Sequence, residues 1–250
     1  MPESRHFSGA IIRRALKPAG ACRTINRPLQ ALTPEELAAT STKTLGHYQR
    51  LADEFFLGTQ DHDVSQNIEA LLRNIDGGGP YDILDFGCGP GRDLLALRQL
   101  GHRPVGIDGC SAFVEMAENL SDCKIWHQDF LNLRLPDNAF DGIFANASFF
   151  HVPRQELDRV LRELYDCLRP GGVLFSSNPR GPDIERYNGE RYGVFLKKAT
   201  WCAFVLNAGF TELEHFYRPA DQPRERQPWL ATLWRKPTNQ EPKSEALTIS

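Results

Sequence analysis

The stretch YDILDFGCGPGRDLLALRQLGH, residues 81–102, sets three glycines, Gly87, Gly89 and Gly91, between an apolar run and a helical one. The apolar run is short and bounded, so the pattern predicts a buried parallel strand, a turn and a helix. A glycine-rich turn at this joint lets a ligand approach the backbone, and the helix N-terminus offers free N–H donors. A tight turn without a ligand is the alternative.

Two acidic residues favour the ligand. Asp108 ends the next predicted strand, about 20 residues after the turn, where a carboxylate is placed to accept the hydroxyls of a ribose. A dinucleotide would need a third glycine where Arg92 stands, so an NAD-dependent oxidoreductase is disfavoured. Asp85, just before the turn, would repel a pyrophosphate but could face a sulfonium and an ammonium group. The pattern therefore favours S-adenosylmethionine as the cofactor.

The alternation of strand and helix continues along the chain and predicts a doubly wound α/β sheet with right-handed crossovers. Helix starts are also readable before the glycine turn, at the capping box Thr33-Pro34-Glu35-Glu36 and at Asp63 with Gln66. We expect strands over 81–86, 104–108, 123–130, 140–148, 173–178, 211–219 and 229–237, and helices over 42–56, 91–101, 111–120, 153–168 and 200–210.

Five short motifs in order resemble those of the class I S-adenosylmethionine-dependent methyltransferases, in the branch that acts on small molecules. They are DFGCGPGRD, GIDGCS, QDF, FDGIFANASFFH and LRPGGVLFSS, within a resemblance that covers about residues 48–236. The resemblance implies a seven-stranded Rossmann-like sheet with an N-terminal helical cover. It also implies that Asp108 holds the ribose, that Asp129 bonds the adenine amino group and that Phe130 brackets the adenine ring.

The resemblance and the glycine turn together give a set of expected cofactor residues. The chain departs from the family at Phe113, which stands where a Met is common and keeps an apolar surface against the adenine. The segment 146–149 lacks the prolines of the box found in nucleobase and protein-amide methyltransferases, so that chemistry is disfavoured. The expected cofactor residues are Tyr48, Asp85, Gly87, Cys88, Gly89, Gly91, Arg92, Asp108, Gly109, Phe113, Asp129, Phe130 and Asn146.

His151 follows the fourth strand, at the sheet edge where open α/β folds bind ligands, and is the expected catalytic residue. It would hydrogen-bond the acceptor or remove a proton; a histidine that bonds a backbone carbonyl is the alternative. Tyr48 is either a lid over the donor or part of an apolar stripe with Leu45 and Phe55. His62 either faces the acceptor or has a capping or solvent role.

The segment 179–195 is expected to be an irregular lid between the fifth strand and the last helix. Its arginines and aromatic residues would bind an anionic or aromatic acceptor, although acidic neighbours make a solvated loop the alternative. The expected acceptor residues are His62, Phe149, Phe150, Arg180, Arg191 and Tyr192. A non-catalytic protein that binds S-adenosylmethionine is the competing function.

Composition narrows the setting of this chemistry. Residues 1–30 carry six basic residues and one acidic one; since the whole chain sums to −3, the other 220 residues sum to −8. A net-acidic body argues against a nucleic-acid surface, and the lack of a long apolar run argues against a membrane partner. Six scattered cysteines without a C-x-x-C pair predict no metal site and a cytoplasmic location.

The expected division is a basic leader over 1–32, a helical cover over 33–76, a cofactor-binding domain over 80–236 and a flexible tail over 237–250. The leader is either a disordered extension or an organellar transit peptide. The sequence leaves the oligomeric state, the acceptor and the methylated atom open.

Overall fold

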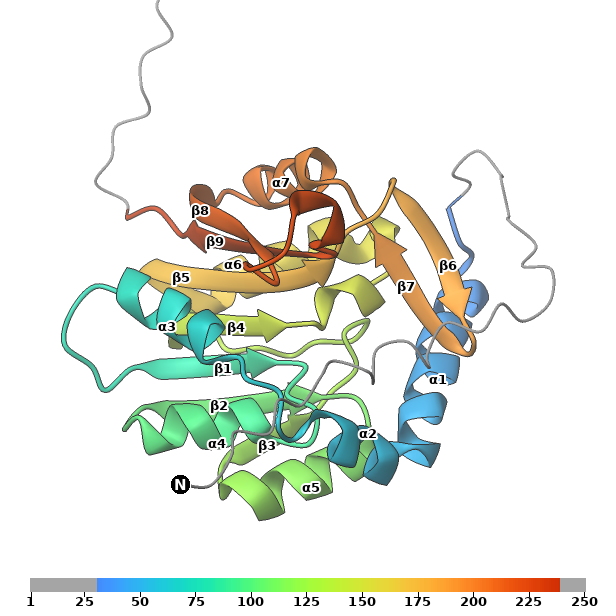
Figure 1. Cartoon of the computed structure of the whole chain (residues 1–250), viewed down its shortest axis with the longest axis horizontal. Helices are drawn as coiled ribbons and strands as arrows, with labels where there is room; N and C mark the ends of the chain where they lie inside the picture. Colours follow the sequence, from blue (N-terminus) through green and yellow to red (C-terminus); the bar gives the residue numbers. More distant parts are fainter. Residues whose placement is uncertain (1–30, 239–250) are drawn as a thin grey trace, which may run out of the picture. The chain divides into compact units, whose positions relative to one another are not determined.

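A computed structural model describes residues 31–238, and its centre is a seven-stranded sheet in the order β3-β2-β1-β4-β5-β9-β8 (Figure 1). The first five strands in this order are parallel, and β9 and β8 run antiparallel to their neighbours. The α/β prediction is confirmed. The strands are β1 (Asp82–Phe86), β2 (Arg103–Asp108), β3 (Lys124–His127), β4 (Phe140–Asn146), β5 (Leu168–Pro179), β8 (Thr211–Arg218) and β9 (Trp229–Arg235).

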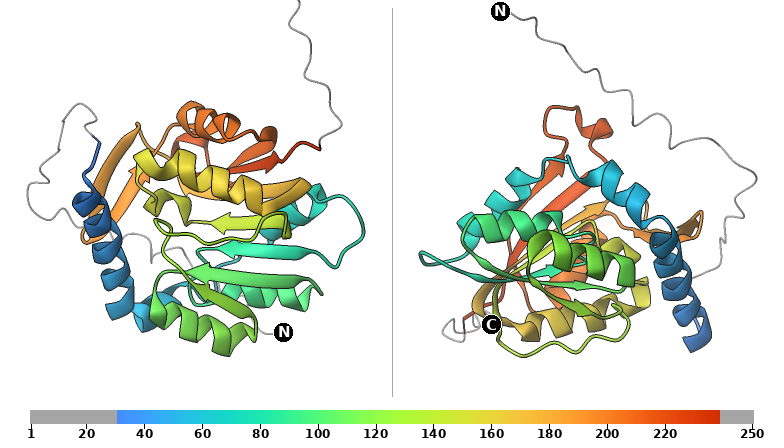
Figure 2. Two further views of the ribbon diagram at one scale, coloured as in Figure 1. Left: turned by 180° about the vertical axis from the view of Figure 1, so that it is seen from behind. Right: turned by 90° about the horizontal axis from the view of Figure 1, so that it is seen from below.

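Helices cover both faces of the sheet, as the turned views show (Figure 2). Most of them match the residue ranges expected from the alternating pattern. The helices are α1 (Pro34–Arg50), α2 (Ala52–Thr59), α3 (Ser65–Asn74), α4 (Arg92–Gln99), α5 (Ser111–Ser121), α6 (Leu157–Cys167) and α7 (Lys198–Asn207), with short 3-10 turns η2 (Phe149–His151), η3 (Arg154–Glu156) and η4 (Arg224–Arg226).

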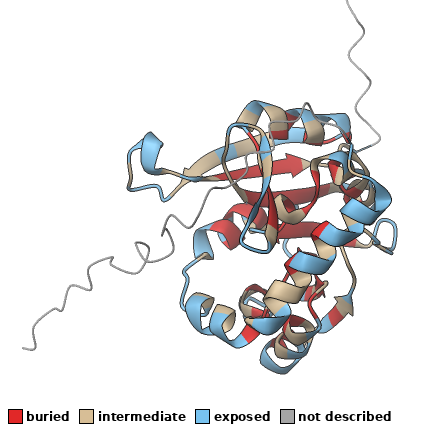
Figure 3. Ribbon diagram, turned by 90° about the vertical axis from the view of Figure 1, so that its right-hand side faces the viewer, coloured by how far each residue is buried: buried red, intermediate tan, exposed pale blue. Residues whose placement is uncertain are grey.

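Alternation along the strands builds a separate apolar layer on each face. On β1, Leu84 and Phe86 join the larger core cluster, which includes α6 and α7, whereas Ile83 joins the cluster that contains α3 residues and Leu97 of α4. Colouring by burial shows the strands buried in the middle and the outer sides of the helices exposed (Figure 3). The sheet therefore has an α6/α7 face and an α3/α4 face. The parallel strands β1 and β4 end at the same edge of the sheet, which we call its carboxyl edge.

The N-terminal helices begin and end at slightly different places from those expected. The capping box at Thr33 forms in both directions, but α1 then runs without a break to Arg50 instead of starting again at residue 42. Asp63 does not occupy the N-cap of α3; its carboxylate instead accepts a hydrogen bond from the N–H of Ser65, at 2.9 Å. The side chain still stabilises this helix start, from one position earlier.

The expected irregular lid is a β-hairpin. Strands β6 (Ile184–Asn188) and β7 (Arg191–Phe195) pair antiparallel, with Gly189 in the turn at a φ of 63°. The hairpin lies beside α1 in the separate views (Figures 1 and 2). The expectation was wrong because the Asn188-Gly189 pair between alternating residues is a hairpin signal that favours ordered pairing.

The N-terminal helices and the sheet fall within one unit that begins at Ala31. The expected leader and tail lie almost entirely outside the described residues, and the division between cover and cofactor domain stays a prediction. Between residues 31 and 238, no helix combines the length and the apolar character needed to cross a bilayer.

Candidate functional site

The glycine turn between β1 and α4 brings the backbone close to its neighbours. A Cβ atom on Gly87 would lie 2.5 Å from the Cβ of Ser148, and one on Gly91 would lie 2.7 Å from the Cα of Ala117. Gly89 differs, because its nearest neighbour would be the ring of Phe55, 3.9 Å away. Packing thus requires glycine at positions 87 and 91, whereas an added Cβ on Gly89 would make only an ordinary contact with Phe55 of α2. We call Asp85, Gly87, Gly89, Gly91 and Asp108 the glycine-loop site.

Asp85 is buried at the end of β1, with 2% of its surface exposed. Its Oδ2 atom has no hydrogen-bond partner. Burial, together with the nearby charge of Asp93, raises the pKa of Asp85 well above its ordinary value. A buried carboxylate without a partner is costly unless a cation or a donor reaches it. This orphaned oxygen fits the positively charged end of S-adenosylmethionine.

Asp108, at the end of β2, is held by backbone donors. Its two oxygens accept hydrogen bonds from the N–H groups of Gly89 and Cys110, each at 2.9 Å. Burial raises the pKa of Asp108 to about 6, although these two bonds oppose the effect. Each carboxylate oxygen has a second lone pair, so the group can still accept the two hydroxyls of a ribose. The residue expected for the ribose is therefore fixed in orientation.

Asp129 and Phe130 follow β3, where the resemblance expects the adenine. Asp129 accepts hydrogen bonds from the N–H of Leu131, at 2.9 Å, and from the hydroxyl of Ser41 on α1. Phe130 stacks on Phe86 with ring centres 4.2 Å apart. Both side chains already have protein partners. To bind the adenine as expected, Asp129 would have to accept a further hydrogen bond beside the one from Ser41, and Phe130 would have to use the ring face that does not stack on Phe86.

The N-terminal helices cover the glycine-loop site with an aromatic cluster. The rings of Tyr48 and Phe55 lie 5.5 and 5.2 Å from the ring of Phe113, which is buried at the start of α5. Gln49 of α1 accepts hydrogen bonds from the hydroxyl of Ser111 and the N–H of Ala112. Because α5 has no cap of its own, the cover helix completes this helix start. Gln49 was missed, since no local pattern marks a cap supplied from a distant helix.

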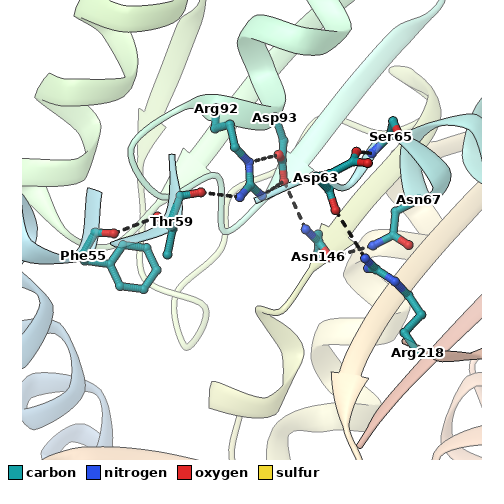
Figure 4. A network of polar contacts seen from close by, with 9 residues as sticks. All are labelled: Phe55, Thr59, Asp63, Ser65, Asn67, Arg92, Asp93, Asn146 and Arg218. Carbon is teal, nitrogen blue, oxygen red and sulfur yellow. Dashed lines mark hydrogen bonds and ion pairs between the residues drawn. The ribbon is translucent and has the colours of Figure 1, made fainter. Parts of the chain in front are cut away.

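A polar network ties α2 and α3 to α4 and to the end of β4 (Figure 4). Arg92 donates to the carbonyl of Thr59, at 2.8 Å, and pairs with Asp93. Asn146 donates to Asp93 at 3.2 Å and accepts from the Nδ2 of Asn67 at 3.1 Å. The expected cofactor residues Arg92 and Asn146 thus meet in one network.

Asn67 joins Thr59 and Asp93 among the network members that were not expected at the site. It is fully buried on α3, and its Oδ1 atom has no partner. The available signal was an amide on the helix face that also carries Ile68 and Leu71.

His151 and Tyr48 form a half-buried hydrogen-bonded pair. The Nδ1 of His151 lies 2.7 Å from the carbonyl of Tyr192, which only accepts, so Nδ1 carries the proton. Its Nε2 is then an acceptor and receives the hydroxyl of Tyr48 at 2.8 Å. Burial lowers the pKa of His151 to about 4, so the ring is neutral at pH 7. The structure contains the bond to a backbone carbonyl that was one alternative, and the second ring nitrogen is occupied by the Tyr48 hydroxyl.

Arg191 and Tyr192, the hairpin residues expected at the acceptor, contact α1. The guanidinium of Arg191 lies 5.9 Å from the ring centre of Tyr48. Tyr192 is buried; its hydroxyl donates to Glu185, and its N–H donates to Thr44 of α1 at 2.9 Å. The side chain of Arg191 and the backbone of Tyr192 therefore hold the hairpin against α1.

A cavity lies at the carboxyl end of β5, on the α6/α7 face. It encloses about 330 Å³ of space, part of it open to solvent. Three of the expected acceptor residues, Phe149, Phe150 and Arg180, meet here. We call it the β5 cavity; its lining residues are Phe149, Phe150, Leu157, Asn178, Pro179, Arg180, Val194, Leu196, Trp201 and Leu230.

Three further expected residues have simpler surroundings. His62 is exposed between α2 and α3, apart from the β5 cavity lining. Cys88 is buried in the glycine turn, and burial raises the pKa of its thiol well above the ordinary value, so it stays protonated. Gly109 packs against Leu45 of α1, where an added Cβ would lie 3.0 Å from the leucine methyl groups.

Comparison with known proteins places these features in context. The family described as "Methyltransferase domain" matches residues 83–172. Trans-aconitate 2-methyltransferase of Azoarcus sp. is 30% identical over 67% of this chain and 68% of its own length. Sterol 24-C-methyltransferase erg6 of Aspergillus fumigatus is 28% identical over 83% of this chain; the match spans 64% of the fungal protein, slightly under two thirds of its length.

A solved structure has the same fold. It is the 1,6-didemethyltoxoflavin-N1-methyltransferase of Burkholderia thailandensis, with bound 1,6-didemethyltoxoflavin and S-adenosylhomocysteine. The two chains align with a TM-score of 0.68 and 20% identity, covering 85% of this chain and 93% of the other. At this identity the likeness shows the fold alone.

Proposed function

Because the chain belongs to the class I S-adenosylmethionine-dependent methyltransferases, we propose that it transfers a methyl group to a small-molecule acceptor. The observation that carries the proposal is the buried, unpartnered oxygen of Asp85 beside the glycine turn. Burial of this charge is compensated when a cationic ligand reaches it. The nearby Asp108, fixed by backbone donors, supports a ligand that also carries a ribose.

The expected cofactor residues lie at three strand ends, and each strand end would bind a different part of S-adenosylmethionine. We assign the methionine part to Asp85 and the glycine turn, the ribose to Asp108, and the adenine to the segment Asp129–Phe130 with Phe113. When bound, S-adenosylmethionine supplies a methyl group on a positively charged sulfur, which is already a good electrophile. The protein then has to align the acceptor and exclude water.

Positioning is the main contribution that we assign to this chain. Well-oriented reactants reach effective molarities of roughly 10⁵–10⁸ M, whereas a positioned base contributes about 10²–10⁴-fold. The cover supports such alignment, because Phe55 approaches Gly89 and Tyr48 packs on Phe113. Closing the cover over the glycine-loop site would remove water from the reacting groups.

His151 is the residue that we propose to receive a proton from the acceptor. Its Nε2 lone pair is aimed at the Tyr48 hydroxyl. An acceptor N–H or O–H could replace this hydroxyl, or Tyr48 could take the acceptor proton while passing its own to Nε2. A pKa of about 4 makes His151 a weak base, so its contribution lies at the low end of the range for general bases.

A small acceptor is supported by three observations. The −8 charge outside residues 1–30 disfavours a nucleic acid. The β5 cavity is lined mostly by apolar side chains and lies at the same sheet edge as the glycine-loop site. Two of the relatives are named for sterol and trans-aconitate methylation, both of small molecules.

The test is to incubate the full chain with a metabolite extract and S-adenosylmethionine labelled in its methyl group. We expect a labelled small molecule by mass spectrometry with the native chain, and none with Asp108→Ala. Calorimetry with S-adenosylhomocysteine provides the control for binding. Binding without any consumption of the donor would contradict the proposal and favour a non-catalytic protein that binds S-adenosylmethionine.

A further inference from the structure

The β5 cavity continues into a row of side chains across three strands. Asn178 of β5 pairs with Leu230 of β9, which pairs with Tyr217 of β8. Residues directly opposite each other in a sheet point to the same face, so these three side chains form one row. Trp201 closes the cavity from α7, with its indole N–H donated to Thr232 at 3.0 Å.

Asn178 brings an unused hydrogen-bond acceptor to this apolar space. Its Oδ1 atom is buried and has no partner. Apart from Asn178 and Arg180, the residues that line the cavity are apolar. A buried acceptor without a donor is destabilising, so such groups usually have a partner in the functional state. A ligand with an N–H or O–H group would provide it.

Two arginines meet next to this row without a counter-ion. The guanidinium carbons of Arg180 and Arg224 lie 5.2 and 3.1 Å from the centre of the Tyr217 ring. Arg180 also donates to the carbonyl of Gln227 at 3.0 Å. Within residues 31–238, neither arginine has a carboxylate oxygen within the 4.0 Å of an ion pair, although Asp221 and Glu225 are near in sequence.

The two positive charges oppose each other. Burial and the charge of Arg224 together lower the pKa of Arg180. Like charges held beside one ring are stabilised by an anion that contacts both of them. Arg180 therefore connects an apolar cavity to a positively charged site.

We propose that the β5 cavity and the Arg180–Arg224 pair form one binding site for an amphipathic anion, with the apolar body in the cavity and a carboxylate or phosphate against the arginines. An N–H or O–H of the same ligand would donate to Asn178. The identification of this ligand as the methyl acceptor rests on the proposed function, whereas the site itself rests on the contacts above.

This site narrows the acceptor class. Arg180 and Arg191, both expected at the acceptor, lie in different surroundings, because Arg191 packs on Tyr48 and Arg180 lines the cavity. Of these two arginines, only Arg180 combines a positive charge with enclosed apolar surface. The anionic end of the ligand therefore belongs at Arg180, which leaves its other end for the His151 side of η2.

The test compares matched ligands that differ in charge. The probes are trans-cinnamate with cinnamamide, octanoate with octanamide, and phenyl phosphate with phenol, titrated calorimetrically into the full chain. We expect the anion of at least one pair to bind about tenfold more tightly than its neutral partner, as for one charge-assisted hydrogen bond. Arg180→Gln and Arg224→Gln should each reduce this preference to about threefold or less.

Two control variants separate the site from general effects. Arg226→Gln removes a charge from the same short turn, and the preference should remain. Leu230→Trp fills the cavity and should weaken both members of a pair. Thermal unfolding checks that each variant is folded. The absence of an anion preference in every pair, or a preference that both arginine variants keep, would overturn the proposal.

The same titrations distinguish this inference from the proposed function. S-Adenosylhomocysteine binding and labelled-methyl transfer are measured on the same preparations. Methyl transfer without an anion preference would refute the binding site alone. An anion preference without methyl transfer would refute the function and leave the binding site standing.

Discussion

The glycine-loop site and the β5 cavity lie at the same edge of the sheet but are built differently. The first uses polar groups at the ends of adjacent parallel strands, and backbone N–H groups fix them, as at Asp108. The second uses apolar side chains from η2, β5, β7, α7 and β9. Fixed polar groups suit one constant ligand, whereas a cavity made of side-chain volume changes with each substitution. Under the proposed function, the constant donor would bind at the glycine-loop site and the variable acceptor at the β5 cavity.

The largest expected effect is a loss of cofactor affinity at the glycine-loop site alone. Asp108→Ala removes the carboxylate proposed to accept two ribose hydroxyls, and each charge-assisted bond contributes about 1.5–3 kcal/mol. We expect the affinity for S-adenosylhomocysteine to fall about 300-fold, by calorimetry, while the cinnamate-to-cinnamamide preference remains. Asp122→Ala, at an exposed position, is the control. A loss below about tenfold would remove Asp108 from the site.

The glycine turn separates packing from ligand access. Ala at Gly87 combines a positive φ with a 2.5 Å contact to Ser148, whereas Ala at Gly89 brings the φ strain alone. We expect Gly87→Ala to lower the free energy of unfolding by about 3 kcal/mol and Gly89→Ala by about 1 kcal/mol, measured in urea. Equal losses would show that Gly87 is constrained by its backbone conformation and not by the contact.

His151 lies between the two regions. His151→Ala removes the proposed proton acceptor and should lower turnover about 100-fold, the low end of the range for a positioned base, while leaving S-adenosylhomocysteine affinity nearly unchanged. Tyr48→Phe keeps the aromatic packing and removes only the hydroxyl, so it tests whether the proton passes through Tyr48. Single-turnover rates across pH are the measurement. Unchanged turnover in His151→Ala would reduce the histidine to a structural bond with Tyr192.

The smallest effect is a difference in pH dependence. With a pKa of about 6, Asp108 becomes protonated as the pH falls and accepts hydroxyl groups less well. Affinity for S-adenosylhomocysteine should therefore drop about fourfold between pH 8 and pH 5.5, if only the ionised form binds. Asp85, whose pKa is also raised, acts in the same direction. Asp108→Asn should weaken this dependence; a flat profile in the native chain would contradict it.

The raised pKa of Asp108 also makes the stability of the ligand-free protein depend on pH. The folded state holds this proton more tightly than the unfolded chain, whose aspartate pKa is 3.8. The resulting stabilisation is full below about pH 3.8 and is lost as the pH rises through about 6. The site therefore carries an unfavourable charge at neutral pH, which a bound ligand would offset.

The residues of the glycine-loop site could be predicted because they lie in short sequence motifs. The motif DFGCGPGRD fixed a strand, a turn and a helix, and Asp108 followed at the next strand end. Because parallel strands end at one edge, residues from β1, β2 and β4 had to meet there. The hairpin over 184–195 was missed although Asn188-Gly189 marks it, since charged neighbours obscured the alternation.

The lining of the β5 cavity could be predicted only in part. Phe149, Phe150 and Arg180 were expected to lie together at the acceptor, and they do line this one cavity. Asn178 was not expected, because its importance comes from its register with Leu230, which depends on how β5 pairs with β9. The separation of Arg191 from Arg180 depends on how the hairpin packs on α1.

The sequence by itself determined the alternation of strands and helices, the glycine turn that joins β1 to α4, and the cofactor class, because each follows from short runs of consecutive residues. Only the tertiary structure decided which nitrogen of His151 carries the proton, which arginine faces the cavity, and that the Oδ2 of Asp85 is buried without a partner. These properties depend on contacts between residues far apart in the chain, and no local pattern encodes those distances.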